Sequence, residues 1–290
     1  MTVEDPGERP VEADETEPAQ PELFEGPPAE AVARMRVGAP AQRNRKLARF
    51  LEAANDDLQL KAWWYAAQSM ADRLGMSDHS WVHVRIVLNL ALRLFRLLRQ
   101  QGVQPAMVTA HRMRVADAEV VIAAACLLHD TGMSVHRADH EAYSLFLAAD
   151  KLGGLLDGVY EEPERSVVVA EAMHAIIGHR RRGEPLTLEA GVVRVADALD
   201  MTHGRSRVPF ERGRPNIHSL SAAAIDEVVL GPGVERAVRI EIAMNNSSGL
   251  FQVDELLATK LRGSGLEEHV EVVARIDAEH EKRLVPVFTI

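Results

Sequence analysis

The 290-residue chain is poor in cysteine, in aromatic residues and in long apolar runs. Its single cysteine, Cys126, excludes a disulfide framework within the chain and a cysteine-based zinc cluster, and it favours a reducing compartment. The longest apolar run, residues 120–128, is far shorter than the roughly 20 residues that span a bilayer. Because the N-terminus also lacks a basic start followed by an apolar stretch, we expect a soluble, cytoplasmic protein with no membrane partner.

Basic residues are too few to balance the acidic ones, since 33 Lys and Arg stand against 43 Asp and Glu, a formal net charge of −10. Residues 1–30 hold ten acids and one base, so about −9 of this charge lies there and the rest of the chain carries about −1. This distribution excludes a globally basic nucleic-acid binder, and we expect no duplex nucleic acid among the partners.

Residues 1–38 contain six of the 14 prolines together with the acidic excess, and they contain few large apolar groups. Such a segment cannot bury enough apolar surface to offset its chain entropy. We therefore predict a disordered, acidic, proline-rich tail over residues 1–38. A solubilising role is favoured over a partner-binding role.

Residues 39–212 show the spacing of apolar residues that is typical of amphipathic helices. Two helices separated by Asn55-Asp56-Asp57 are expected first, and the next is expected to begin after Ser77 or Asp78 and to end near Gly102. Further helices are predicted over residues 117–129, 141–151, 164–177 and 188–202. The absence of an alternating strand pattern up to about residue 210 predicts an all-helical domain.

Residues 213–290 are predicted to form a small α/β domain. A β-hairpin is indicated by residues 228–230 and 238–243 around Gly231-Pro232-Gly233, followed by a helix over 253–261 and strands over 270–276 and 284–290. The predicted fold class is therefore mainly α, with a small C-terminal α/β domain. An open strand edge there favours a homodimer, and a lid over the substrate is the alternative role.

Histidines and aspartates stand at the ends of the predicted buried helices. His129 and Asp130 follow the most apolar segment, and burial of either without a partner would be costly, so we expect a shared cation. Upstream, His79 and His83 are four residues apart and lie on one helical face. The further candidates downstream are His140, His174, His179 and Asp197.

In this order and context, the chain resembles the HD superfamily of metal-dependent phosphohydrolases. The pattern of that superfamily is a His, a later His-Asp pair at a helix end and an Asp on a later helix. The matching positions are His83 in HVRIV, His129 and Asp130 in LLHDTG, and Asp197 in VRVADALD. The resemblance covers about residues 76–205, and it implies that these four residues hold a divalent metal ion.

A second ion is implied by the superfamily members that carry additional histidines, and His140 and His179 fit those positions. His174 can face the same site only if Gly178 ends the helix between it and His179. Imidazole and carboxylate ligands without thiolate suit Mn, Fe, Ni, Co, Zn or Mg, so we expect one to two divalent ions. Asp130 can bridge two ions that hold a hydroxide, and the predicted catalytic residues are His129, Asp130 and Asp197.

Phosphate contacts are predicted for arginines close to this site, because a guanidinium can bond two phosphate oxygens. The predicted set is Arg180, Arg181, Arg205 and Arg207. The sequence departs from the superfamily pattern at Met133, where one large branch has Lys, and it lacks the GYP signature, which argues against cyclic-di-GMP. Asp200 is expected to orient a ligand or an arginine.

These residues favour a phosphomonoesterase or phosphodiesterase that acts on a nucleotide, a cyclic nucleotide or a similar small phosphorylated metabolite through a metal-bound hydroxide. Two alternatives remain open from the sequence. One is an HD-type diiron oxygenase, because some relatives use the same His and Asp set on iron. The other is a nucleotide-binding sensor without catalysis that signals through the C-terminal domain.

Overall fold

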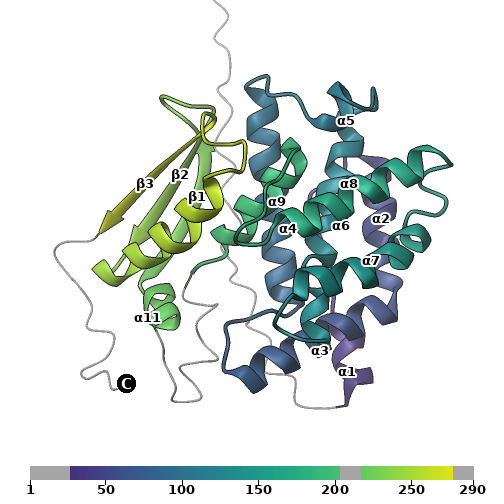
Figure 1. Ribbon diagram of the computed structural model, residues 1–290, viewed down its shortest axis with the longest axis horizontal. Helices are drawn as coiled ribbons and strands as arrows, with labels where there is room; N and C mark the ends of the chain where they lie inside the picture. The colour runs from purple at the N-terminus through teal and green to yellow at the C-terminus, as the bar shows by residue number, and fades with distance from the viewer. Residues whose placement is uncertain (1–26, 203–216, 277–290) are drawn as a thin grey trace, which may run out of the picture.

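The computed structural model describes residues 27–202 and 217–276, and it shows a bundle of helices with a small sheet at one side (Figure 1). The helical elements of the bundle are α1 (Pro28–Arg34), α2 (Arg45–Asp56), α3 (Leu58–Leu74), α4 (Trp81–Gln100), α5 (Ala106–Thr109), α6 (Val115–Leu128), η1 (Thr131–Ser134), α7 (His140–Leu155), α8 (Glu164–Gly178) and α9 (Leu188–Leu199). The predicted fold class, mainly α with a small C-terminal α/β part, is confirmed.

Helix starts in the bundle follow local capping signals. The Asp57 carboxylate accepts the backbone N–H of Leu60 at 2.8 Å and begins α3, as the Asn55-Asp56-Asp57 segment predicts. The cap of α4 is Ser80, whose Oγ accepts the Val82 N–H at 3.1 Å, so the prediction of Ser77 or Asp78 is wrong. Asp78 instead accepts the Ser80 N–H at 2.7 Å and forms the turn before the helix.

Helix α6 forms the centre of the bundle. Every residue from Val120 to Leu128 is fully buried, and α2, α4, α8 and α9 pack around the helix. A helix that is apolar on all sides is stable only when it is surrounded in this way. The end of α6 therefore delivers residues 129 and 130 to the interior of the protein.

Residues 27–38 are ordered, and the prediction of disorder is wrong for this part of the tail. Helix α1 packs against α3, and Val32, Met35 and Val37 are buried. The Asn55 side chain pairs with the backbone N–H and C=O of Val37 at 2.9 and 2.7 Å. Three apolar side chains are too few to form a periodic pattern, but they suffice once a neighbouring helix covers them. Residues 1–26 lie outside the described residues.

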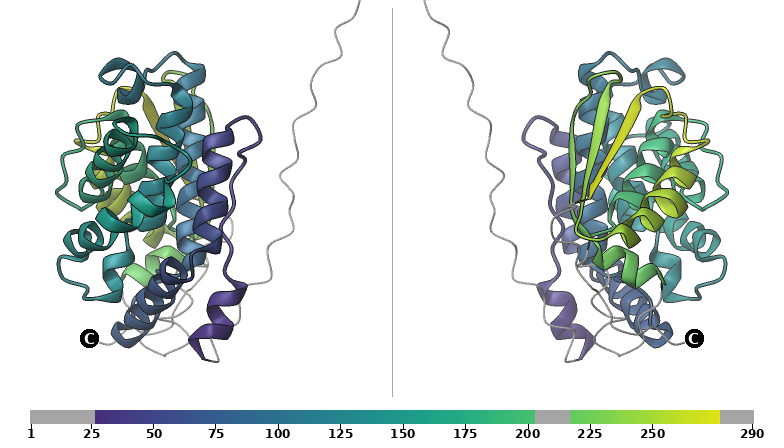
Figure 2. Two further views of the ribbon diagram at one scale, coloured as in Figure 1. Left: turned by 90° about the vertical axis from the view of Figure 1, so that its right-hand side faces the viewer. Right: turned by 90° about the vertical axis from the view of Figure 1, so that its left-hand side faces the viewer.

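The C-terminal part contains α11 (Ile217–Ala223), β1 (Ile225–Pro232), β2 (Val238–Met244), η2 (Ser247–Gly249), η3 (Gln252–Ala258), α12 (Thr259–Leu261) and β3 (Val270–Ile276). The sheet order is β1-β2-β3, with β1 antiparallel and β3 parallel to β2. The connection from β2 to β3 passes through η3 and α12, and these helical elements run alongside the sheet (Figure 2). The predicted hairpin and the strand over 270–276 are confirmed, and the strand predicted over 284–290 lies outside the described residues.

The sheet shares one apolar core with the helical bundle. The cluster of buried apolar residues that contains Leu88 of α4 also contains Ile240 and Ile242 of β2. Helix α4 contacts β1 and β2, and α9 contacts η3 and α12. Gly191 allows α9 to pack closely against the segment that follows α12, because a Cβ at residue 191 would overlap the carbonyl oxygen of Ser264. The predicted boundary between residues 212 and 213 lies outside the described residues.

Across residues 27–202 and 217–276, no helix has both the length and the apolar composition that crossing a membrane requires.

Candidate metal centre

Five structural elements bring six buried ligand candidates together. His83 lies in the first turn of α4, His129 and Asp130 follow α6, and Asp197 lies in the last turn of α9. His140 begins α7, and His179 ends α8. Helix ends converge here because the apolar bodies of α4, α6, α8 and α9 pack against each other. All six residues are at most 8% exposed.

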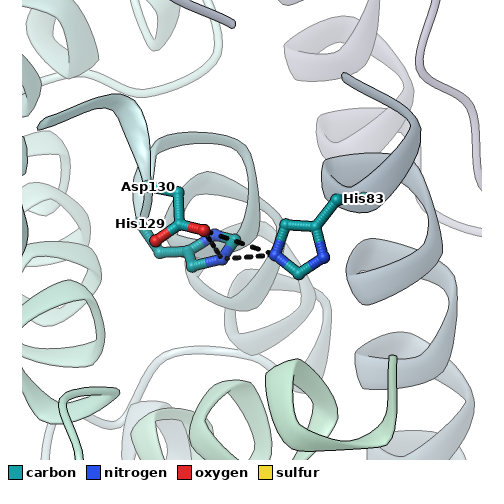
Figure 3. Close-up of side chains that lie close together, drawn as sticks. All are labelled: His83, His129 and Asp130. Carbon is teal, nitrogen blue, oxygen red and sulfur yellow. Dashed lines mark hydrogen bonds and ion pairs between the residues drawn. The ribbon is translucent and has the colours of Figure 1, made fainter. Parts of the chain in front are cut away.

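His83, His129 and Asp130 form one group of donors (Figure 3), and Asp197 lies beside them with its Oδ1 3.8 Å from His129 Nε2. His83 Nε2 lies 3.2 Å from His129 Nε2, 3.4 Å from Asp130 Oδ2 and 3.4 Å from Asp197 Oδ1. His129 Nε2 lies 3.3 Å from Asp130 Oδ2. Ligands that each stand about 2.1 Å from one ion lie roughly 3.0–3.5 Å apart, so these separations fit a single metal ion.

A second group shares the carboxylate of Asp130. Its Oδ1 lies 3.1 Å from His140 Nε2 and 3.7 Å from His179 Nε2, and the three donors form a second potential ligand set. Oδ2 of Asp130 faces the first group, and Oδ1 faces the second. A carboxylate with its two oxygens in two donor groups is suited to bridge two ions.

The four histidines share one orientation. The Nδ1 atoms of His129 and His179 lie 2.9 and 2.5 Å from the carbonyl oxygens of Cys126 and Ile176, three residues earlier on each helix. Nδ1 of His140 lies 3.1 Å from the carbonyl oxygen of Arg137, and Nδ1 of His83 lies 2.5 Å from Asp200 Oδ2. In the neutral rings of His83, His129 and His179, donation from Nδ1–H leaves Nε2 with a lone pair for an ion. Nδ1 of His140 also lies 2.8 Å from Arg137 Nη1, a group that can only donate.

The turn after Asp130 is locked to the first turns of α7. Ser144 Oγ donates to the His129 carbonyl at 2.6 Å and accepts the Gly132 N–H at 2.8 Å. A Cβ at residue 132 would clash with the His140 carbonyl oxygen and would lie 2.5 Å from the Ser144 nitrogen. Only glycine therefore allows the approach that places His140 beside Asp130.

The protein environment keeps both central carboxylates ionised. Burial alone would raise the pKa of Asp130, but the charge of His129 and hydrogen bonds from His129, His140 and His179 hold it well below its usual value. Burial likewise opposes ionisation of Asp197, whereas the charge of Lys260 and a hydrogen bond from His83 keep its pKa well below normal. Burial lowers the pKa of His179, which favours the neutral form that a metal ligand needs.

Two buried cationic side chains near the centre are not predicted from the sequence. Lys260 of α12 pairs with Asp197 Oδ2 at the centre, and Arg194 of α9 is a buried guanidinium that binds backbone carbonyls at the end of α8 and at α12. No motif marks either residue. Arg194 precedes the predicted ligand Asp197 by about one helical turn. This spacing places Arg194 near the site, but it does not predict which groups the guanidinium binds.

Other predicted site residues lie away from the two ligand groups. The prediction of His174 as a metal ligand is wrong. Its Nε2 accepts the backbone N–H of Leu186 at 2.9 Å, and His174 belongs to neither ligand group. His79 lies next to the centre, with its ring centroid 5.8 Å from that of His83, and its Nδ1 faces the Ser77 carbonyl oxygen at 2.7 Å. Arg180 and Arg181 are exposed, and Arg181 pairs with Glu255 at 2.7 Å. Arg205 and Arg207 lie outside the described residues.

The ligand chemistry fits divalent ions. Four imidazole nitrogens with fixed orientation and two ionised carboxylates converge, and no thiolate is present among these donors. Such a set suits Mn, Fe, Ni, Co, Zn or Mg. The fold and the centre thus define a helical protein with a buried His and Asp site for divalent metal.

Comparison with known proteins agrees with this class. The HD domain family matches residues 80–202. An uncharacterized protein of Methanocaldococcus jannaschii is 39% identical over 207 residues, which are 71% of this chain and 80% of that protein. No solved structure matches the chain. The chain belongs to the HD-domain family, within the superfamily of metal-dependent phosphohydrolases.

Proposed function

We propose that this protein is a metal-dependent phosphohydrolase acting on a nucleotide, a cyclic nucleotide or a similar small phosphorylated metabolite, as a phosphomonoesterase or a phosphodiesterase. The observation that carries the proposal is the shared carboxylate of Asp130, with one oxygen in each of two donor groups. Two bound divalent ions would supply Lewis acidity to phosphoryl oxygens and lower the pKa of a water molecule.

The chain's own residues would hold this arrangement rigid. His83, His129, Asp130 and Asp197 would bind one ion, and Asp130, His140 and His179 would bind the other. The contacts at each Nδ1 hold the imidazole rings in place before any ion binds, so little reorganisation is needed. His129 and Asp197, with Asp130, are the residues that we assign to catalysis.

The predicted phosphate contacts follow the second donor group. Arg180 and Arg181 directly follow His179, which brings a basic segment to the end of α8. Their exposure leaves both guanidinium groups accessible to an anionic ligand. We propose that they bind distal parts of the substrate, together with Arg205 and Arg207.

The test is hydrolysis by protein loaded with Mn²⁺ or Fe²⁺, with oxygen consumption followed in parallel. Hydrolysis is measured as phosphate release from nucleoside monophosphates and as formation of the nucleoside monophosphate from cyclic nucleotides. We expect Asp130→Asn to abolish hydrolysis and to reduce the number of bound ions. Asp150→Asn, at an exposed position on α7, is the matched control and should retain activity. Oxygen consumption without hydrolysis of either substrate class, or full activity in Asp130→Asn, would refute the proposal.

A further inference from the structure

We propose that Lys260, supplied by the C-terminal appendage, binds a phosphoryl oxygen of the ligand at the metal centre. This inference rests on the proposed function, because it assigns a phosphate contact to the same site. Lys260 lies in α12, outside residues 80–202 that match the HD domain. The appendage would then complete the active site rather than merely cover it.

The ammonium group of Lys260 reaches the centre through Asp197. It pairs with Asp197 Oδ2, whereas Oδ1 of the same carboxylate lies 3.4 Å from His83 Nε2 and faces the first donor group. The Lys260 side chain is only 14% exposed. The Asp197 carboxylate therefore lies between the ammonium and the expected ion. A phosphoryl group bound to that ion would lie close to the ammonium.

The position of Lys260 is built into the fold by Arg194, which is 2% exposed. Arg194 Nε donates to the Lys260 carbonyl at 2.8 Å, and its Nη2 donates to the carbonyls of Arg181 at 2.9 Å and Thr259 at 3.3 Å. Nη1 donates to Gly178, directly before His179. One guanidinium thus ties the turn that carries Lys260 to the helix end that carries a metal ligand.

The chemistry of the group suits an anion. An ammonium has three N–H donors, so Lys260 can bond Asp197 and a phosphoryl oxygen at the same time. The HDTGM segment supplies no cation, because Met stands at position 133. Its side chain is fully buried in a small apolar cluster with Ala67 and Ala71. Lys260 is therefore a cationic side chain paired with a carboxylate ligand candidate of the centre, Asp197.

The experiment is calorimetric titration of inorganic phosphate into the Mn²⁺-loaded full chain, with Mn²⁺ affinity measured separately. Loss of a charge-assisted hydrogen bond in Lys260→Met should raise the Kd for phosphate about 10- to 100-fold and leave the Kd for Mn²⁺ within about threefold. Lys260→Arg should retain most of the phosphate affinity. Lys260→Gln serves as the second neutral variant if Lys260→Met does not fold.

Lys151→Met is the matched control. Lys151 also pairs with an aspartate, Asp57, at 2.8 Å and has a side chain that is 13% exposed, but it lies outside the centre. Both Kd values should stay unchanged in this variant.

Three results would overturn the inference. Unchanged phosphate affinity in the neutral variants would make Lys260 only a counter-ion of Asp197. Tighter Mn²⁺ binding at constant phosphate affinity would make it a cation that the metal displaces. Absence of phosphate binding by the unmodified protein would show that Lys260 does not bind a phosphate at this site. Phosphate release from substrates is a separate readout, so phosphate binding without hydrolysis would refute the proposed function and support this inference.

Discussion

At the scale of single residues, the orientation of each imidazole is decided by the oxygen that its Nδ1 faces. Three of these acceptors are backbone carbonyls, of Cys126, Ile176 and Arg137, and arise from local helix-end geometry. The fourth is the side chain of Asp200, which is 4% exposed and belongs to a different helix end from His83. The orientation of His83 therefore depends on a side chain that is distant in sequence, and mutation of Asp200 can change it.

Asp200→Ala should weaken Mn²⁺ binding about 10- to 100-fold, because His83 loses the acceptor that holds Nδ1–H and raises the basicity of Nε2. Asp200→Asn keeps an acceptor oxygen and should lose less. Calorimetry with Mn²⁺ measures both variants, and an affinity of Asp200→Ala equal to that of the unmodified protein would show that Asp200 does not orient His83.

Asp117 predicts a pH-dependent contribution to stability. Burial would raise its pKa, but hydrogen bonds from Lys46, the Arg114 N–H and Tyr160 hold the pKa below its usual value. A carboxyl with a depressed folded-state pKa stabilises the fold above its unfolded-state pKa of about 3.9, and this stability is lost as pH falls through the folded-state pKa.

Asp117→Asn should therefore lower the free energy of unfolding by about 2 kcal/mol at pH 7 and by less at pH 3. Urea unfolding at the two pH values measures the difference. An equal loss at both values would mean that ionisation of Asp117 does not contribute.

At the scale of structural elements, the junction between the end of α6 and the start of α7 sets the spacing of the two donor groups. Ser144 bonds to the His129 carbonyl and the Gly132 N–H, and Gly132 lies directly against the His140 backbone. The distance between Asp130 and His140 thus depends on packing between two elements rather than on either helix alone.

Gly132→Ala should destabilise the fold by about 1–3 kcal/mol, because the added methyl group meets backbone atoms that cannot move independently. It should also weaken binding at the Asp130, His140 and His179 group more than at the other. Gly154→Ala, at an exposed position of α7 where a Cβ meets no atom within 4 Å, is the control and should be neutral or stabilising. Thermal unfolding and Mn²⁺ stoichiometry measure both effects, and equal behaviour of the two variants would contradict the role of Gly132.

At the scale of the whole molecule, the sheet and the helical bundle are joined by a continuous apolar core. Leu88 of α4 and Ile240 of β2 are both fully buried members of it. Lys260 and Arg194 add polar links between the appendage and the metal centre. The appendage is thus bound to the bundle by burial as well as by hydrogen bonds.

Unfolding should accordingly occur in one cooperative transition. Leu88→Ala and Ile240→Ala should each lower the stability by about 2–5 kcal/mol and should shift the same transition, whether it is followed by helical or near-ultraviolet circular dichroism. Separate transitions for the two variants would show that the sheet folds as an independent unit.

Homodimerisation stays a prediction at this scale. Strand β3 pairs with β2 on one side, and its other edge has no strand partner among residues 27–202 and 217–276. A mass of about 64 kDa by light scattering, twice the 31.9 kDa of the chain, is the expected result, and a monomeric mass would reject it.

The sequence by itself determined the long helices, the hairpin and all six ligand candidates now grouped at the centre. These depend on contacts between residues a few positions apart or on a recognised order of His and Asp. The start of α4 was misplaced by a few residues because three polar residues compete to cap it. The prediction of disorder over residues 27–38 was wrong because their few apolar side chains are buried only through packing against another helix.

Only the tertiary structure decided how those residues meet. It split the oxygens of Asp130 between two groups, separated His174 from His179, and brought Lys260 to Asp197 across 63 positions of sequence. The contact between Lys260 and Asp197 follows from the packing of α9 against α8 and α12, where Arg194 binds carbonyls of Gly178 and Lys260. Local patterns carry no record of such distant contacts, because each is set by the combined burial of several elements.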